Sequence, residues 1–427
     1  MCWWRAPAVG FTPTMTSGRT WRRPTGRSAR VGLAAAVECR PKGHWSWPRQ
    51  ATPRPGPAPH SDDTKRCHRG SATVGETSTM KALVLHGVGD GRLERIARPV
   101  AGPGQVRVRV AFCGVCGSDI PRAFVKGTYR FPTVCGHEFA GTVESVGPGV
   151  SGFSPGDRVT VFPLVWCGRC AACERAQFAQ CADYDYYGSR RDGAFAELVV
   201  VPARNLLRVP EGVSLEAASL TEPAAVALHG LKRAGGQLVG QTVAVFGAGP
   251  VGLLVAQWAR IMGAARVVLF DPIPRKREVA GQLGFPLAFD PTGEDPVHRV
   301  FDLTDAQGAD VCVEAAGVPA TMTQALAAAR AGGRVVVLGN PSADVTLPAG
   351  LISQTMRREL TIAGSWNSTF SPAGNNDDWH TVLAAAAAGQ LQLDPLVTHR
   401  VPLDQAWEAL LMMRDGSEFF LKVLVQP

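Results

Sequence analysis

Two hydrophobic patterns of different kinds follow each other along the chain. Within residues 80–225, short apolar runs rich in β-branched residues alternate with glycine-containing turns. The clearest of these runs lie at 106–111, 140–146, 158–162 and 195–201. Runs of this length, separated by turn residues, predict an irregular and mostly antiparallel β-barrel.

In the next region, apolar runs are separated by segments in which apolar residues recur at helical spacing. Thr242–Phe246 is a short apolar run, 253–262 repeats apolar residues at helical spacing, and 266–270 is apolar again. Further runs that end near glycines lie at 310–313, 334–338 and 360–363. Strands that alternate with helices predict an α/β fold with a doubly wound parallel sheet, which we expect over 227–362.

The turn between the first of these strands and the helix has the spacing of a dinucleotide-binding loop. It reads Gly247-Ala-Gly249-Pro250-Val251-Gly252. A lone G-x-G-x-x-G is a weak signal, but one between a strand and a helix is strong. The first glycine permits the tight turn, the second lets the backbone approach a pyrophosphate, and the third lets helix and strand pack closely.

An acidic residue stands where such a site recognises the ribose. Asp271 ends the next predicted strand, 19 residues after the last glycine of the loop. Its carboxylate can accept hydrogen bonds from both ribose hydroxyls and would repel a 2′-phosphate, which favours NAD over NADP. Arg275 and Lys276 could soften this preference, but we expect them to be solvated residues at the start of a helix.

Four cysteines lie close together in the first region. The segment Cys167-x2-Cys170-x2-Cys173-x7-Cys181 brings together the four thiolates that a tetrahedral structural zinc requires. A disulfide cluster and an iron–sulfur cluster are the alternatives. The sequence shows a sizeable core and no signal peptide, so we favour zinc and a reducing, cytoplasmic environment.

Charge separates the first 79 of the 427 residues from the rest. Residues 1–79 carry a net charge of +9 and residues 80–427 a net charge of −1, so the basic character gives no reason to expect a nucleic-acid partner.

This first stretch is rich in proline and lacks a helical or strand period. It could be a disordered tail, a targeting peptide, or upstream sequence translated from an early start. We favour the third interpretation, with Met80 as the working first residue, because the orderly pattern begins there.

Two further motifs within the predicted barrel carry metal-binding chemistry. They are Cys116-Gly-Ser118-Asp119 and Gly136-His137-Glu138. Cysteine, histidine and glutamate together suit zinc, and three protein ligands leave a coordination position for a substrate. No run of 18 uncharged apolar residues occurs, so we expect no transmembrane helix and no membrane partner.

In this order, the motifs resemble those of the zinc-dependent medium-chain dehydrogenases over about residues 80–427. Within that family the chain is similar to the polyol branch, which includes the sorbitol dehydrogenases. Two longer strings, 181–193 and 359–366, are similar to those of the galactitol-1-phosphate dehydrogenases. The motifs that carry the resemblance are Gly114-Val-Cys116-Gly-Ser118-Asp119, Gly136-His137-Glu138, Gly156-Asp157-Arg158-Val159, the four-cysteine segment, Glu222-Pro223 and the loop Gly247–Gly252.

The resemblance implies a second zinc, which is catalytic. Cys116 and His137 would be direct ligands, and either Glu138 or Glu222 would complete the site, one directly and the other through water. Zinc would lower the pKa of the substrate hydroxyl, and hydride would pass to the nicotinamide. Asp119 would fix the tautomer of His137.

The resemblance also implies the division of the chain and its activity. A GroES-like catalytic domain would comprise 80–226 and 363–427, with a Rossmann domain between them at 227–362. Ser118 would relay the proton of the substrate hydroxyl, and Arg190 and Arg191 would either be a solvated turn pair or contact an anionic substrate or cofactor. We expect NAD-linked oxidation of a secondary alcohol of a polyol or polyol phosphate, by a homodimer or homotetramer.

Three other functions compete with this expectation. A sorbitol- or threonine-type dehydrogenase would act on an unphosphorylated polyol, sugar acid or amino-alcohol. A non-catalytic nucleotide-binding protein would keep the fold without turnover, but Cys116, His137, Glu138 and Glu222 are all intact. Nucleic-acid binding would have to rest on residues 1–79 alone.

Overall fold

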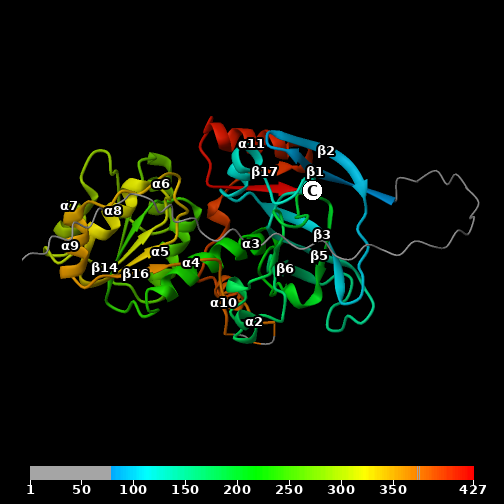
Figure 1. Ribbon diagram of the computed structural model, residues 1–427, viewed down its shortest axis with the longest axis horizontal. Helices are drawn as coiled ribbons and strands as arrows, with labels where there is room; N and C mark the ends of the chain where they lie inside the picture. Colours follow the sequence, from blue (N-terminus) through cyan, green and yellow to red (C-terminus); the bar gives the residue numbers. More distant parts are fainter. Residues whose placement is uncertain (1–77, 373, 375) are drawn as a thin grey trace, which may run out of the picture. The chain divides into compact units, whose positions relative to one another are not determined.

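The computed structural model describes residues 78–427, except 373 and 375 (Figure 1). The chain divides into two units, Met1–Gly70 and Ser71–Pro427, and all the described residues belong to the second. The interpretations offered for the first 79 residues therefore concern a stretch that lies almost wholly outside the described residues.

The first region forms the expected, mostly antiparallel β-structure. A seven-stranded sheet has the order β10-β6-β5-β3-β18-β17, with β9 paired to β3, and a three-stranded sheet has the order β2-β1-β4. The only parallel pair in these two sheets of the described chain is β17 with β18. The strands are β1 (Thr79–Gly87), β2 (Asp90–Ala97), β3 (Gln105–Gly114), β4 (Thr133–Val134), β5 (Glu138–Val146), β6 (Arg158–Val161), β9 (Leu198–Pro202), β10 (Leu206–Arg208), β17 (Val397–Pro402) and β18 (Lys422–Gln426).

The central strand β3 shows why these segments form a sheet with one buried face. Val106, Val108 and Val110 are buried in the core, whereas Arg107 and Arg109 between them are more exposed. This alternation follows the two-residue period of a strand. Two C-terminal strands, β17 and β18, complete the same sheet, as the resemblance implied for residues 363–427.

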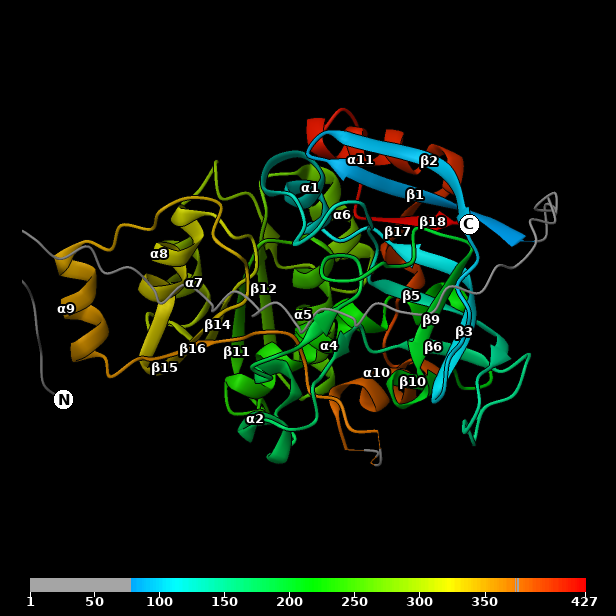
Figure 2. The same ribbon diagram turned by 45° about the vertical axis from the view of Figure 1, so that its right-hand side comes forward.

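The second region forms one six-stranded sheet in which every pairing is parallel. Its order is β13-β12-β11-β14-β15-β16, and Figure 2 shows β11, β12, β14 and β15 side by side. The expected end at residue 362 is slightly too early, because the edge strand continues to Gly364. The strands are β11 (Thr242–Phe246), β12 (Arg266–Phe270), β13 (Ala288–Phe289), β14 (Ala309–Glu314), β15 (Ala329–Val337) and β16 (Thr361–Gly364).

Helices cover both faces of this sheet. Val243 and Val245 pack in one core with residues of α4, α5 and α6, whereas Ala244 and Phe246 pack in another with residues of α7 and α8. This is the doubly wound arrangement that the apolar runs predicted. The helices are α4 (Thr221–Arg233), α5 (Pro250–Ile261), α6 (Pro274–Gln282), α7 (Pro296–Leu303), α8 (Pro319–Ala328) and α9 (Ala349–Arg357).

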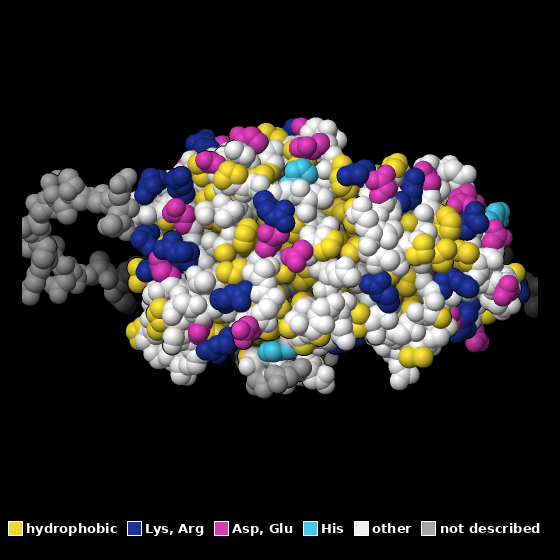
Figure 3. Space-filling model, turned by 180° about the vertical axis from the view of Figure 1, so that it is seen from behind, with side chains coloured by type: hydrophobic (Ala, Val, Ile, Leu, Met, Phe, Trp, Pro, Cys, Tyr) yellow, Lys and Arg dark blue, Asp and Glu magenta, His cyan; other side chains and the backbone are white. Residues whose placement is uncertain are grey.

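The remaining elements are short or belong to the C-terminal return of the chain. No helix of the described residues is both long enough and apolar enough to cross a membrane. On the face shown in Figure 3, basic and acidic side chains are interspersed. The elements are α1 (Asp119–Pro121), α2 (Ala171–Glu174), α3 (Leu215–Ser219), α10 (Asp378–Ala387), α11 (Ala406–Asp415), β7 (Leu164–Val165), β8 (Asp185–Tyr186), and helical turns at Arg122–Lys126, Phe178–Gln180, Ala203–Asn205, Asp394–Leu396 and Leu403–Gln405.

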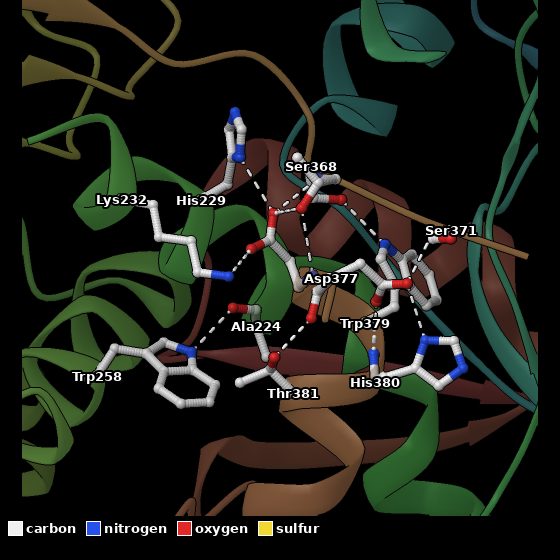
Figure 4. Close-up of polar contacts among 12 residues, drawn as sticks. Ala224, His229, Lys232, Trp258, Ser368, Ser371, Asp377, Trp379, His380 and Thr381 are labelled. Atoms are coloured by element: carbon white, nitrogen blue, oxygen red, sulfur yellow. Dashed lines mark hydrogen bonds and ion pairs between the residues drawn. The ribbon is translucent and has the colours of Figure 1, made fainter. Parts of the chain in front are cut away.

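A buried carboxylate anchors the C-terminal return on helix α4 (Figure 4). Asp378, at the first position of α10, accepts hydrogen bonds from the backbone N–H and the hydroxyl of Thr369 at 2.6 and 2.7 Å. Its other contacts come from α4: Nδ1 of His229 lies 3.1 Å from Oδ2, and Nζ of Lys232 lies 2.8 Å from Oδ1. Nδ1 of His229 is therefore engaged in a contact that joins two parts of the fold.

Candidate active site

The pairing of two strands brings the predicted metal ligands together. Cys116 follows β3, and His137 and Glu138 stand at the start of β5, where Gly114 is directly opposite Glu138. A Cβ atom on Gly114 would lie 2.2 Å from Oε2 of Glu138, so only glycine permits this approach. One donor atom from each of Cys116, His137 and Glu138 lies within 4.8 Å of the other two.

A hydrogen-bonded turn holds Cys116 in place. Oδ2 of Asp119 accepts the backbone N–H of Cys116 at 3.0 Å, and Oδ1 of Asp119 lies 3.6 Å from Nδ1 of His137. Arg122 donates from Nη1 to the Asp119 carboxylate at 3.0 Å and to the hydroxyl of Ser118 at 2.9 Å. Ser118 in turn donates to Sγ of Cys116 at 3.1 Å. Asp119 therefore fixes the cysteine backbone and lies beside His137, but Nδ1 of His137 has no hydrogen-bond partner among the described residues, so the expected tautomer-fixing bond is not formed here.

A buried lysine that the sequence reasoning missed completes the surroundings of Glu138. Nζ of Lys422, on β18, lies 2.6 Å from Oε2 of Glu138 and donates to the carbonyl of Val115 at 3.2 Å. Burial lowers the pKa of Lys422, but the adjacent Glu138 carboxylate raises it, and the net shift is upward. The available signal was a lysine on an otherwise apolar strand, since a buried lysine needs an anionic partner.

Glu222 lies on the same cavity but outside the group of three donors. It stands in the first turn of α4, and its Oε1 accepts a hydrogen bond of 3.2 Å from the hydroxyl of Tyr186. Burial raises the pKa of Glu222 to about 7, His137 opposes this shift, and Glu138 adds to it. Among the described residues, the close donor group contains Glu138 and not Glu222.

These residues line a cavity of about 240 Å³. Residues of the antiparallel region and residues of the parallel-sheet region both bound it. The nucleotide-binding half contributes Val251, from the glycine-rich loop and α5, and Leu338, which follows β15. The side near the catalytic motifs contributes Cys116, Ser118, Arg122, Tyr129, His137, Glu138, Tyr184, Tyr186, Ser189, Arg190, Glu222 and Pro223, and the chain after β16 contributes Ser365, Trp366 and Asn367.

The four-cysteine segment forms a second, separate group. The sulfur atoms of Cys167, Cys170, Cys173 and Cys181 all lie within 4.8 Å of one another, and none is in a disulfide. Hydrogen bonds from the backbone at Ala182 and Cys173 lower the pKa of Cys170 to about 6, whereas burial raises the pKa of Cys181 to about 12. Four convergent sulfurs fit a tetrahedral zinc, which would have to displace the proton of Cys181 on binding.

The glycine-rich loop has the shape that the dinucleotide fingerprint predicts. A Cβ atom on Gly252 would lie 1.8 Å from the carbonyl oxygen of Gly247, so a glycine is needed for the helix to pack against the strand. A Cβ atom on Gly249 would meet nothing within 4 Å, which leaves open space beside the backbone there. Pro250 is the first residue of α5, so the loop leads directly into a helix N-terminus.

Asp271 is more constrained than the sequence suggested. The carboxylate is buried and accepts backbone N–H groups of Ala248 at 2.9 Å and of Ile273 at 3.0 Å. Arg275 is exposed as expected and pairs with Glu278. The expectation for Lys276 holds in part: the residue lies in the first turn of α6, but its side chain is half-buried and its Nζ lies 3.7 Å from Oδ2 of Asp271.

Comparisons with known proteins agree with this geometry. A family model described as the alcohol dehydrogenase GroES-like domain matches residues 102–211, and one described as zinc-binding dehydrogenase matches 250–388. Galactitol 1-phosphate 5-dehydrogenase of Escherichia coli K12 is 35% identical over 69% of this chain and 85% of its own length. L-threonine 3-dehydrogenase of Pyrococcus horikoshii is 35% identical over 75% of this chain and 90% of its own. The crystal structure of the galactitol-1-phosphate dehydrogenase from Escherichia coli superposes with a TM-score of 0.76 at 32% identity, over 82% of this chain and 100% of that one.

Proposed function

Because the chain belongs to the zinc-binding alcohol dehydrogenase family, we propose that it oxidises a secondary alcohol of a polyol or polyol phosphate and passes the hydride to NAD. The observation that carries this proposal is the group Cys116, His137 and Glu138, which opens into a cavity also lined by Val251 of the dinucleotide loop. The proposal is supported because the assigned metal ligands and the assigned cofactor loop line one small cavity. We take 80–226 with 365–427 as the catalytic domain and 227–364 as the nucleotide domain, since β16 extends to Gly364.

We assign Cys116, His137 and Glu138 to the catalytic zinc and the four cysteines 167, 170, 173 and 181 to the structural one. A thiolate, an imidazole and a carboxylate are zinc donors, and three of them leave room for a substrate oxygen. When bound there, zinc supplies Lewis-acid chemistry that makes an alcohol more acidic. Glu222 faces the same cavity from α4, and its Oε1 accepts a hydrogen bond from Tyr186. We assign Glu222 the binding of a second hydroxyl of the substrate.

The neighbouring residues orient this group. Asp119 holds the backbone of Cys116, and its carboxylate stands 3.6 Å from Nδ1 of His137. Lys422 fixes Glu138 through a buried ion pair. We assign Ser118 the contact with the proton of the reacting hydroxyl. Its own hydroxyl, which donates to Cys116 here, must rotate so that its oxygen accepts a hydrogen bond from the reacting hydroxyl and its own hydrogen points to the next acceptor of a proton relay.

We assign the cofactor to Gly247, Gly249, Pro250, Val251, Gly252 and Asp271. The loop would receive the pyrophosphate at the N-terminus of α5, and the nicotinamide end would reach the cavity past Val251. Asp271, at the end of β12, would accept the ribose hydroxyls and exclude a 2′-phosphate.

A substrate panel tests the proposed function. Galactitol, sorbitol, the 1-phosphate of each and L-threonine are offered with NAD, and NADH formation is followed by absorbance. Turnover of at least one hexitol or hexitol phosphate supports the proposal. Turnover of L-threonine alone would favour the threonine-type alternative, and NAD binding without any turnover would favour the non-catalytic one.

A paired substitution ties turnover to the assigned group. Cys116→Ser should lose turnover and keep NAD binding, because the cysteine lies outside the dinucleotide loop. Cys312→Ser is the control, since it alters a buried cysteine of β14 that does not line the cavity. Loss of activity in the control alone would contradict the assignment of Cys116.

A further inference from the structure

Two guanidinium groups lie on the same cavity as the metal-binding residues. Arg122 is already engaged, because it donates to Asp119 and to Ser118. Arg190 is different: within the described part of the chain it takes part in no ion pair, and its buried Nε has no hydrogen-bond partner. A buried donor without an acceptor is energetically unfavourable, so this side chain is suited to an anion that the protein itself does not provide.

Aromatic rings hold the free guanidinium in place. The Cζ atom of Arg190 lies 4.1 Å from the centre of the Tyr129 ring and 4.4 Å from that of the Tyr184 ring. Cation–π contacts of this kind favour the charged group and limit its motion. Both tyrosines line the cavity, and the Tyr129 residue is largely exposed to solvent. Arg190 therefore lies where the cavity meets solvent.

The backbone fixes Arg190 relative to the metal-binding group. The carbonyl of Tyr186 accepts the backbone N–H of Arg190 at 3.0 Å, and the same tyrosine bonds Glu222 through its hydroxyl. Three residues after Arg191, the N–H of Ala194 donates to the carbonyl of Gly136 at 3.0 Å. Since Gly136 precedes His137, the loop that carries Arg190 is tied to the backbone of a metal-binding residue.

The adjacent Arg191 has a different environment. It lines another cavity, and its Nη1 lies 3.5 Å from a carboxylate oxygen of Asp185. Its guanidinium lies over the ring of Tyr187, with 4.8 Å between Cζ and the ring centre. Of the two arginines that the sequence singled out, only Arg190 faces the candidate active site.

We propose that Arg190 is the specificity-determining residue that binds a terminal phosphate monoester of the substrate. This deepens the proposed function and rests on it. The planar guanidinium can donate two parallel hydrogen bonds to phosphate oxygens. A phosphate monoester carries close to two negative charges at neutral pH, so the guanidinium of Arg190 attracts it more strongly than it attracts a carboxylate.

Kinetics on matched substrates test the proposal. The wild-type enzyme should have a higher kcat/KM for a hexitol 1-phosphate than for the same free hexitol. Arg190→Gln should lower kcat/KM for the phosphorylated form by about tenfold or more, mainly through KM, and should lower it far more than kcat/KM for the free hexitol. Arg190→Lys should recover part of the loss, and Arg191→Gln, the matched control, should keep the wild-type ratio.

Inhibition by inorganic phosphate provides a second measurement, which does not require a phosphorylated substrate. Inorganic phosphate should inhibit oxidation of the free hexitol competitively in the wild-type enzyme and much less in Arg190→Gln. If Arg190→Gln does not fold, Arg190→Lys replaces it, because a point charge should give a weaker but measurable phosphate effect.

The outcomes separate this proposal from the function on which it rests. Oxidation of the free hexitol with no preference for its phosphate, or equal losses on both substrates in Arg190→Gln, would overturn the phosphate site and leave the dehydrogenase. A preference for a hexonate over the hexitol phosphate would assign Arg190 to a carboxylate instead and overturn the proposal. Failure to oxidise either form of any hexitol would overturn the proposed function itself.

Discussion

At the scale of single residues, Asp271 is the residue to which we assign the choice between NAD and NADP. Its two carboxylate oxygens each accept a backbone N–H, so the group is fixed in the position from which it can meet the ribose. The nearby Lys276 partly offsets its charge. A fixed carboxylate repels a 2′-phosphate more effectively than a mobile one, while the lysine attracts it.

Replacing this carboxylate should change cofactor choice. Asp271→Ala should narrow the gap in kcat/KM between NAD and NADP, because NAD loses an acceptor for its ribose hydroxyls and NADP loses a repulsive charge. Lys276→Ala should shift the preference the other way, toward NAD. Both are measured by steady-state kinetics with each cofactor at fixed substrate. Equal wild-type kcat/KM for NAD and NADP would show that Lys276 cancels the carboxylate.

The sequence predicted the chemistry of single residues better than their partners. Cys116, His137 and Glu138 could be found because they lie in short motifs, and adjacent strands then bring them together. Lys422 could not be assigned to Glu138, because the two are 284 residues apart in the sequence and meet only once β18 joins β3. Arg190 and Arg191 could not be told apart either, since neighbouring residues of a turn can face different cavities.

At the scale of elements, we expect the four-cysteine lobe to depend on a bound metal. It contains only one short helix and one helical turn, α2 and Phe178–Gln180, besides the stacked rings of Trp166 and Phe178. With so little core of its own, the lobe should take much of its stability from zinc.

We expect metal-replete protein to contain about two zinc ions per chain, one for each tetrahedral site. Cys170→Ser should remove one and lower Tm by several degrees, whereas His137→Ala should lose turnover and keep most of the stability. Elemental analysis, thermal unfolding and turnover are measured on the same samples. A zinc content near one that Cys170→Ser leaves unchanged would contradict a metal in the lobe.

Helix α4 connects the candidate site with the C-terminal return. Its first turn carries Glu222, and its last turns supply His229 and Lys232 to the buried Asp378. Burial raises the pKa of Asp378, but the hydrogen bonds from His229 and Lys232 and those at Thr369 lower it, and the net shift is downward. A carboxyl whose pKa is lower in the folded state stabilises the fold above its unfolded pKa, and this contribution is lost as pH falls through the folded pKa.

Asp378→Asn should therefore reduce the free energy of unfolding at neutral pH by about 1–3 kcal/mol, because an amide cannot replace a carboxylate as the partner of Lys232. The difference between the variant and the wild type should shrink on acidification below about pH 4, the ordinary range of an aspartate. Urea unfolding at several pH values measures it, with the exposed Asp404→Asn as control. If the difference in unfolding free energy between the variant and the wild type stays constant down to the lowest pH measured, the loss comes from packing and not from charge.

At the scale of the whole molecule, periodicity predicted the two architectures but not their limits. Alternating valines in β3 and the strand–glycine–helix order around Gly247 are local signals, and the corresponding sheets formed as expected. The order β13-β12-β11-β14-β15-β16 follows from parallel strands joined by helices on both faces. The pairing of β17 with β18 and of β18 with β3 is set by contacts between distant segments, and no periodicity within 397–426 identifies those partners.

The whole-molecule prediction concerns residues 1–79. Every residue assigned to zinc, cofactor or substrate lies beyond Met80, and the first described strand begins at Thr79. A chain that starts at Met80 should keep kcat/KM within about twofold of the full chain. It loses the carbonyl of Ser78, which accepts the N–H of Arg98 at 3.1 Å, and the hydroxyl of Thr79, which accepts from Arg95. These are two hydrogen bonds, and Thr79 also pairs with Ala97 at the end of the β1–β2 ladder, so the expected loss of stability is about 1–3 kcal/mol. Steady-state kinetics and urea unfolding of both chains check this, and a loss of activity beyond tenfold with intact stability would show that the first 79 residues contribute to the site.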